Sequence, residues 1–448
     1  MEETLQLAKY VCSLDYAAIP AEVLQRGKIC LLDSVAVGLH GSTKPWGKIV
    51  GALVKERGGN GASSIFGDHV KVPSASAALA NGTMIHGFEL DNVRQPGAGA
   101  HAGATIVPAL LAVSEEVHAT GKDFLTALVA GCEVMFRIGL AVGAGVERRG
   151  FHAPGLTGTF GAATAVGKLL GLGVEKLTCA MGICGSLSSG LLEFSRATSG
   201  GMVKRLHLGR AAEGGLMAAL LASKGFTGPQ TILEGEFGFC QVFSDSASSD
   251  RLTAGLGSDF ETMNICIKRY PCHIYAQAPI EALVGLRRDY SFGAEEVEKI
   301  VVAGEEKITT HHAIYEPRDV MMAQYSVPYS VALSLWTDPE DPENFSEKNL
   351  SDSRILGLAR RVELVVDEEI NQMEGSRAAR VTVRLKDGME LKREVLHFKG
   401  TPKSPLTEEE LSSKVKRLAC YALEQEKVGD LIEKVRRLEA IEDMGTLL

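Results

Sequence analysis

The sequence lacks closely spaced cysteine pairs. Its nine cysteines are scattered through 448 residues, and no two of them form a CxxC motif. Zinc sites and redox dithiols normally use such pairs, so we expect neither. Isolated cysteines of this kind are typical of reduced thiols in the core of a cytoplasmic protein, and we predict that location.

Positive charge is also scarce, because 47 Lys and Arg residues face 56 Asp and Glu residues, for a formal net charge of -9. No basic run suited to a phosphate backbone is present, so we expect no nucleic-acid partner. An acidic protein that binds an anion must gather its cations at one place, since its overall field repels the ligand. Local clusters of Lys, Arg and His are therefore the informative feature.

A long apolar run without charge is missing as well. The longest apolar stretch, 124–142, contains Glu133 and Arg137, which are four residues apart and can pair on one helical face. We predict a buried helix there and no membrane partner. The chain opens with Met1, Glu2 and Glu3, without the basic and apolar regions of a signal peptide, and we expect none.

Familiar cofactor and catalytic motifs are not found. The segment 162–169, AATAVGKL, resembles a phosphate-binding loop only in part: the first glycine is out of place and no Ser or Thr follows Lys168. No GxGxxG follows a predicted strand, and neither GxSxG nor HExxH occurs. These motifs therefore predict no nucleotide, dinucleotide or zinc-protease site.

The pattern of apolar residues predicts a mainly α protein with a large all-helical domain at 1–265 and a smaller α+β lid domain at 266–404. Helical periodicity marks 21–39, 105–117, 123–142, 152–172 and 211–223, and no convincing strand is seen in this half. In the second part, β-branched runs at 299–302, 361–366 and 379–385 predict strands, and a helix is predicted at 277–288. Asp387-Gly388 predicts a hairpin to a strand at 390–396. Thr407 and Glu410 form a capping-box pattern, and the last helices, 405–448, can pack back on the helical domain.

Five short segments carry polar residues that a buried helical core does not need: 86–103, 148–155, 202–210, 268–273 and 324–329. The first is a glycine-rich loop that leads into a predicted helix, where free backbone N–H groups can hold a carboxylate. The fourth lies at the boundary between the predicted domains, where small molecules often bind. Taken singly, each segment has a plainer interpretation as a solvated loop, a structural histidine, a charged helix face or a packed tyrosine.

Taken together and in order, these segments resemble the MmgE/PrpD family, which includes 2-methylcitrate dehydratase, cis-aconitate decarboxylase and iminodisuccinate epimerase. The resemblance covers most of the chain and is carried by Leu31-Leu32-Asp33-Ser34-Val35-Ala36, His86-Gly87-x-x-x-Asp91, His101-x-Gly103-Ala104, Gly150-Phe151-His152, Gly158-Thr159-Phe160-Gly161, Met202-x-Lys204-x-x-His207-x-Gly209-x-Ala211-Ala212, Lys268-Arg269-Tyr270-Pro271-Cys272-His273 and Ser326-Val327-Pro328-Tyr329.

The resemblance implies a homodimer of two-domain subunits, an active site between the domains, and no metal or organic cofactor. The family's active-site residues fall on Asp91, His101, His152, Lys204, Lys268 and Tyr329. Of these we predict catalytic roles for His101, His152, Lys204, Lys268 and Tyr329. We predict substrate-binding roles for Asp91, Arg94, Arg205, His207 and His273.

Such residues suit proton transfer next to a carboxylate. Fixed cations stabilise the extra negative charge of a carbanion, and histidine is a proton donor or acceptor near neutral pH. We therefore expect a cofactor-independent lyase, either a dehydratase or a decarboxylase, that acts on a small anionic di- or tricarboxylic acid. An epimerase of an imino- or amino-dicarboxylate, such as iminodisuccinate, is the first alternative.

Two departures from the family pattern bear on the substrate. Family members often have a second aspartate where this chain has Asn92, and a proline where it has Ala102. They leave a second alternative, an inert binding homologue. Convergence of the two histidines and two lysines in an open cleft would favour an enzyme, whereas an occluded cleft would favour the inert protein.

Overall fold

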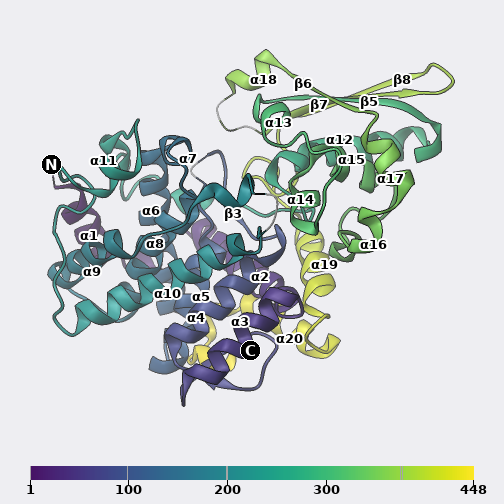
Figure 1. Ribbon diagram of the computed structural model, residues 1–448. Helices are drawn as coiled ribbons and strands as arrows, with labels where there is room; N and C mark the ends of the chain where they lie inside the picture. Colours follow the sequence, from purple (N-terminus) through teal and green to yellow (C-terminus); the bar gives the residue numbers. More distant parts are fainter. Residues whose placement is uncertain (1, 98, 198–199, 374, 376) are drawn as a thin grey trace.

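The computed structural model describes residues 2–97, 99–197, 200–373, 375 and 377–448 (Figure 1). It confirms the expected fold class: a large helical domain is followed by a smaller region in which helices accompany a sheet. The helices of the first part are α1 (Glu3–Ser13), α2 (Ala21–Ser42), α3 (Pro45–Gly58), α4 (Ser74–Ile85), α5 (Ala102–Val117), α6 (Gly121–Val142), α7 (Gly145–Arg148), α8 (Ala153–Leu169), α9 (Val174–Leu187), α10 (Val203–Ser223) and α11 (Phe239–Phe243).

The second part contains α12 (Ile274–Tyr290), α13 (Lys307–Thr310), α14 (Val320–Tyr325), α15 (Val327–Trp336), α16 (Glu347–Leu350), α17 (Ser353–Ala359) and α18 (Glu368–Gln372). Its strands are β5 (Val297–Gly304), β6 (Val362–Val366), β7 (Ala379–Leu385) and β8 (Glu390–Val395). Short 3-10 turns connect the elements throughout the chain: η1 (Tyr16–Ala18), η2 (His86–Phe88), η3 (Leu192–Ser195), η4 (Ser249–Leu252), η5 (Glu261–Asn264), η6 (Ala294–Glu296), η7 (Pro342–Asn344), η8 (Leu438–Ala440) and η9 (Met444–Thr446).

Helix α6 is long and apolar and lies in the interior of the helical domain. Thr120 and Asp123 form a capping box at its start, and Gly143 follows its end with φ of +53°. Glu133 and Arg137 pair at 3.6 Å, as predicted, and both are buried. The helix is long and apolar enough to cross a membrane, but most of its surface is buried against the rest of the domain.

Small residues set the spacing of the helices that carry the site. A Cβ on Gly82 of α4 would lie 2.8 Å from the Cα of Gly209 on α10, so the two backbones cross in contact. Helix α10 also packs against α8 and α9. This close crossing holds the first turn of α10 beside η2, which directly follows α4.

The sheet of the lid has the order β6-β5-β7-β8, with β5 parallel to β6 and the other neighbours antiparallel. The predicted β7–β8 hairpin is present, and Gly388 in its turn has φ of +91°. Helix α12 packs against β7 and β8, and α15 packs against α12. Figure 1 shows this sheet at one end of the molecule, with α12 and α15 between it and the helical domain.

Helices α19 (Glu408–Ala419) and α20 (Gln425–Arg436) return to the helical domain and pack against α2. The Thr407–Glu410 capping box begins α19. The Lys414 ammonium donates to Asp33 on α2 at 2.6 Å and to the carbonyl of Leu90 at 3.0 Å. The last part of the chain therefore supports the loop that carries Asp91.

The expectation of no strand in the first half is wrong in detail. Two-residue strands occur at β1 (Ser63–Ser64), β2 (Lys71–Val72) and β3 (Val93–Arg94), and they are too short to give an alternating pattern. Strand β3 pairs antiparallel with β4 (Ile265–Cys266). This pairing ties the 86–103 loop to the segment that begins at Lys268.

Candidate active site

The core of the site is a carboxylate shared by two histidines. Asp91 Oδ2 lies 2.9 Å from His86 Nδ1 and 2.8 Å from His101 Nδ1. Burial alone raises the pKa of Asp91, but the charges and hydrogen bonds of the two histidines outweigh it and hold the pKa well below its usual range. An ionised carboxylate only accepts hydrogen bonds, so both Nδ1 atoms donate, and the reactive nitrogen of each ring is Nε2.

Helix N-termini place two of the histidines. His101 is the N-cap of α5 and His152 is the N-cap of α8. The His86 ring centroid lies 5.1 Å from that of His101 and 5.9 Å from that of His152, so three imidazoles meet. The predicted helices began at 105 and 152; α5 begins at Ala102, and this earlier start makes His101 a fixed cap.

His152 also contacts His207, one turn after Lys204 on α10. Their Nδ1 atoms are 3.1 Å apart, so one ring donates and the other accepts. Burial lowers the pKa of His152 well below its usual value, and the neighbouring His86 and His207 lower it further. Burial and then Lys204 lower the pKa of His207. The pair is therefore neutral near pH 7 and shares one Nδ1 proton.

Two lysines and a glutamate form the charged part of the site. Lys268 Nζ lies 3.1 Å from one oxygen of Glu89, and Lys204 Nζ contacts the other oxygen. All three side chains are buried. Burial lowers the pKa of both ammonium groups, and for Lys204 the positive charges of Lys268 and Arg205 lower it further.

The lid contributes aromatic side chains that lie close to Lys204. The Lys204 ammonium lies 5.2 Å from the centre of the Tyr325 ring. His273 stacks on His312 at 4.3 Å and contacts Tyr325 at 4.6 Å. Burial raises the pKa of the Tyr325 hydroxyl, so it is a neutral hydrogen-bond donor near pH 7.

Gln324 joins the lid to the helical domain at this point. Its amide donates to the carbonyl of Phe88 at 2.9 Å and to the carbonyl of Pro271 at 3.0 Å. Phe88 belongs to η2, which carries His86. These two hydrogen bonds therefore hold the lid against the helical domain beside the site.

The structure brings together His101, His152, Lys204, Lys268, Asp91, His207 and His273, but it does not bring three other predicted residues into this group. Tyr329 packs in the lid against Phe345. Burial and then the negative charge of Asp352 raise the pKa of its hydroxyl. Arg94 bonds to Glu261 and to the carbonyl of Pro96.

Arg205, predicted as a carboxylate clamp, lies over the Trp46 ring at 3.9 Å and donates to the carbonyl of Gly87 at 2.8 Å. Its guanidinium is committed to the protein and supports η2. Tyr329 was predicted from the family resemblance, and the two arginines were predicted from their charge within the polar segments. Packing turns all three side chains elsewhere.

Three residues of the site were not among the predicted ones: His86, Glu89 and Tyr325. The first two lie inside the motif that contains Asp91, so the glycine-rich loop was the available signal. Tyr325 lies in the same segment as Tyr329, and the sequence offered no way to choose between them. The helix break before Val327, where Ser326 caps α15, separates the two side chains.

His86, Asp91 and His101 could also hold a metal ion, because their ligand atoms all lie within 4.8 Å of one another. The Nδ1–Oδ2 distances of 2.8 and 2.9 Å are those of hydrogen bonds, and a cation would have to displace both Nδ1 protons. The geometry therefore fits two histidine N–H groups that donate hydrogen bonds to one carboxylate better than it fits a bound metal ion.

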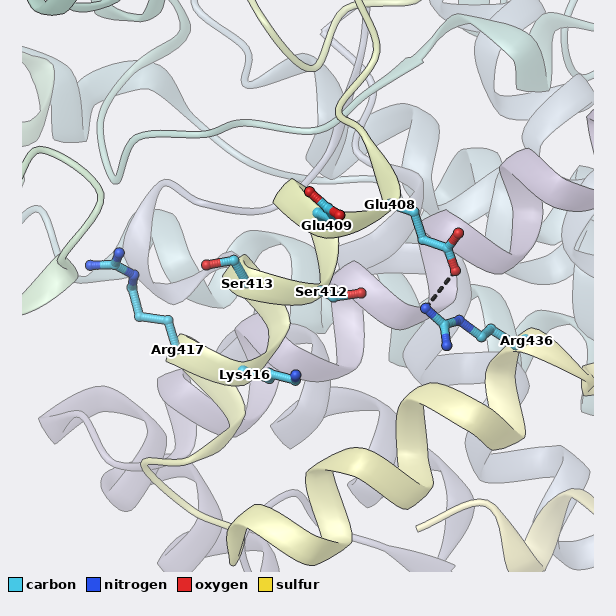
Figure 2. Close-up of a pocket in the computed structure, with 7 residues that line it drawn as sticks. All are labelled: Glu408, Glu409, Ser412, Ser413, Lys416, Arg417 and Arg436. Carbon is cyan, nitrogen blue, oxygen red and sulfur yellow. Dashed lines mark ion pairs between the residues drawn. The ribbon is translucent and has the colours of Figure 1, made fainter. Parts of the chain in front are cut away.

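The histidines and lysines converge, but not in an open cleft: Lys268 is 2% exposed and the His101 side chain is 12% exposed. A surface pocket of about 700 Å³ lies elsewhere, between α19 and α20, where Glu408 pairs with Arg436 (Figure 2). None of the site residues lines it. Among the residues that the structure describes, the site is occluded rather than an open cleft, and this is the arrangement expected of the inert homologue.

Comparison with known proteins gives the family. The MmgE/PrpD N-terminal domain model matches residues 5–251, and the MmgE/PrpD C-terminal domain model matches residues 270–440. The chain belongs to the MmgE/PrpD family. The relatives that match this MmgE/PrpD protein support a lyase.

A cis-aconitate decarboxylase-like protein of Aspergillus oryzae is 30% identical over 468 residues, which cover 99% of this chain and 96% of the relative. The cis-aconitate decarboxylase of Aspergillus terreus is 30% identical over 99% of this chain and 95% of its own length. The human cis-aconitate decarboxylase is 26% identical, with 99% and 93% covered.

Proposed function

We propose that this protein removes CO₂ from an unsaturated tricarboxylic acid of the cis-aconitate class without a metal or organic cofactor. The observation that carries the proposal is the convergence of His101, His152, Lys204 and Lys268 around Asp91 and Glu89. The full-length likeness to cis-aconitate decarboxylases supports decarboxylation over the other reactions of the family.

The charged groups match the electron flow of this reaction. When the C–C bond to the departing carboxylate breaks, its electron pair spreads into the neighbouring double bond and a remaining carboxylate. The ammonium groups of Lys204 and Lys268 stabilise this charge in a buried site, where electrostatic stabilisation is strongest.

The electron pair is then quenched by a proton on carbon. His101 is the proton donor in this proposal, because the Asp91 carboxylate at its Nδ1 stabilises a positive imidazole and directs Nε2–H away from Asp91. His152 is held neutral by burial and by its histidine neighbours, so it acts as a hydrogen-bonding partner of the substrate. Tyr325, beside Lys204, takes the place predicted for Tyr329 as a hydroxyl donor.

Product analysis in D₂O with chelator-treated protein tests the proposal. Cis-aconitate is expected to release one CO₂ and to give a dicarboxylate that carries one deuterium on carbon. Loss of water from citrate or methylcitrate without CO₂ would instead indicate a dehydratase. Deuterium entering iminodisuccinate without loss of either group would indicate an epimerase, and no change in any of these acids would indicate the inert homologue.

The same proposal includes a homodimer in the cytoplasm. The apolar side chains of Leu191, Met202, Val203 and Leu206 are exposed, and a second copy would cover them. Leu206→Glu is expected to halve the molecular mass measured by light scattering, whereas Met217→Glu, farther along α10, serves as the matched control. An unchanged mass for Leu206→Glu would contradict this surface as the interface.

A further inference from the structure

Glu89 occupies the place between the two ammonium groups that a substrate carboxylate would use. One of its oxygens lies 3.1 Å from Lys268 Nζ and the other contacts Lys204 Nζ. The side chain is 6% exposed, and it bridges lysines from segments far apart in the chain. A carboxylate of a small acid would present the same two oxygens to the same two cations.

The backbone of Glu89 shows that this position is imposed by its surroundings. Its φ is +56° and its ψ is +25°, the left-handed region that favours glycine. Contacts on both sides hold the turn: Arg205 and Gln324 donate to the carbonyls of Gly87 and Phe88, and Asp91 is fixed by its histidines. A residue held in a costly conformation at a buried charged site calls for a functional reason.

Charge balance explains what the carboxylate does between the two lysines. Two buried ammonium groups close to one another lose much of their hydration and repel each other, and a carboxylate between them favours the ionised form of both. When a substrate carboxylate arrives, its oxygens and those of Glu89 would repel each other strongly in this buried environment. One carboxylate must leave.

We propose that Glu89 is an internal stand-in for a substrate carboxylate and that a carboxylate of the substrate displaces it from Lys204 and Lys268. This inference rests on the proposed function, since it assumes a polycarboxylate at this site. Displacement uses part of the binding energy of one substrate carboxylate. Net affinity then depends on the other carboxylates, so Glu89 selects di- and tricarboxylates against monocarboxylates.

Binding of tricarballylate, a saturated tricarboxylate without the double bond that the proposed reaction needs, tests the inference by calorimetry. Glu89→Gln removes the competing charge, so we expect tricarballylate to bind about tenfold more tightly to this variant than to the unchanged protein. We also expect acetate to gain measurable binding. Glu89→Asp keeps the charge and should stay close to the unchanged protein, and Glu213→Gln, at the ion pair with Arg210 on α10, controls for the change in net charge.

Measurements at pH 6 and pH 8 separate displacement from loss of lysine charge, because lysines without a counter-ion release their protons more readily at the higher pH. Equal or weaker binding by Glu89→Gln at pH 6 would overturn the inference, since Glu89 would then only orient the lysines. A crystal structure of the unchanged protein with tricarballylate gives a readout that needs no variant. Glu89 should have left both ammonium groups, and a Glu89 still bridging them would refute displacement.

Failure of the proposed function gives a different result. If the unchanged protein binds tricarballylate and displaces Glu89 but releases no CO₂ from cis-aconitate, only the reaction is wrong. If CO₂ is released while Glu89 remains on the lysines, only the displacement is wrong.

Discussion

At the scale of single residues, Asp91 organises the site. One of its oxygens, Oδ2, accepts hydrogen bonds from both His86 and His101, so Asp91 fixes the tautomer of both rings. Burial lowers the pKa of His86 well below its usual value, and Lys204 lowers it further, so His86 is a neutral partner that shares the carboxylate with the proton donor.

Asp91→Asn is expected to lower kcat by about 10²-fold or more, the scale of a lost general acid, because an amide neither stabilises a charged His101 nor accepts as strongly from Nδ1. Steady-state turnover of cis-aconitate measures the loss. Asp245→Asn, at an exposed ion pair with Arg148, is the matched control. Full activity in Asp91→Asn would contradict the role given to the shared carboxylate.

His312 makes folding stability depend on pH. Burial lowers its pKa to about 4, and the hydrogen bond to the carbonyl of Tyr325 only partly opposes this shift. An unfolded histidine has a pKa of about 6.5, so the unfolded chain binds more protons between the two values. The stability that His312 contributes is full above about pH 6.5 and is lost as the pH falls towards 4.

His312→Gln is therefore expected to reduce the slope of unfolding free energy against pH by up to about one proton in this window. Urea unfolding at pH 7, 5.5 and 4.5 measures the slope, and His118→Gln removes a histidine from the surface as a control. His86, His152 and His273 are also buried with lowered pKa, so part of the slope remains. An unchanged slope in His312→Gln would show that His312 titrates alike in both states.

At the scale of elements, the crossing of α4 and α10 determines where Lys204 lies relative to His86. A Cβ on Gly209 would lie 2.3 Å from the carbonyl oxygen of Leu79 and 2.3 Å from Thr83 Oγ1. Helix α4 leads directly into η2, so a shift of one helix moves the histidine loop against the lysine.

Gly209→Ala is expected to lower the free energy of unfolding by about 2–4 kcal/mol, because backbone atoms must move apart. Gly214→Ala on the same helix is the matched control, since its nearest neighbours are 3.6 Å away and alanine favours a helix by up to about 1 kcal/mol. Urea unfolding measures both. Equal stability of the two variants would show that the crossing can relax without cost.

At the scale of the whole molecule, ion pairs hold the lid on the helical domain around a buried site. Lys307 of the lid pairs with Glu147 at 2.7 Å, and Glu343 of the lid pairs with Lys44 and, at 3.2 Å, with His40. The Lys44 and His40 contacts lower the pKa of Glu343 to about 2. These pairs link the two parts of the chain.

The distances around Asp91 also indicate whether the site holds a metal ion. His86, Asp91 and His101 are close enough to bind a cation, yet their distances fit hydrogen bonds. We expect dialysis against EDTA to leave kcat and the melting temperature unchanged. A loss of activity that Zn²⁺, Mn²⁺ or Fe²⁺ restores would show that a metal replaces the two protons.

Much of the fold could be predicted from sequence because its signals are local. The period of apolar residues gave the helices, β-branched runs and Asp387-Gly388 gave the sheet of the lid, and Thr407 with Glu410 gave the start of α19. The two-residue strands β3 and β4 were missed, because pairing over such a length leaves no periodic pattern.

By itself the sequence determined the helical and α+β parts and the residues that could carry the chemistry, since these follow from side-chain type and spacing. Only the tertiary structure decided which of them meet. It turned Arg94 to Glu261, Arg205 to Trp46 and Tyr329 into the lid, and it placed Glu89 between the lysines. The direction of a side chain depends on helix starts, caps and close backbone crossings between segments hundreds of residues apart, and no local pattern contains that information.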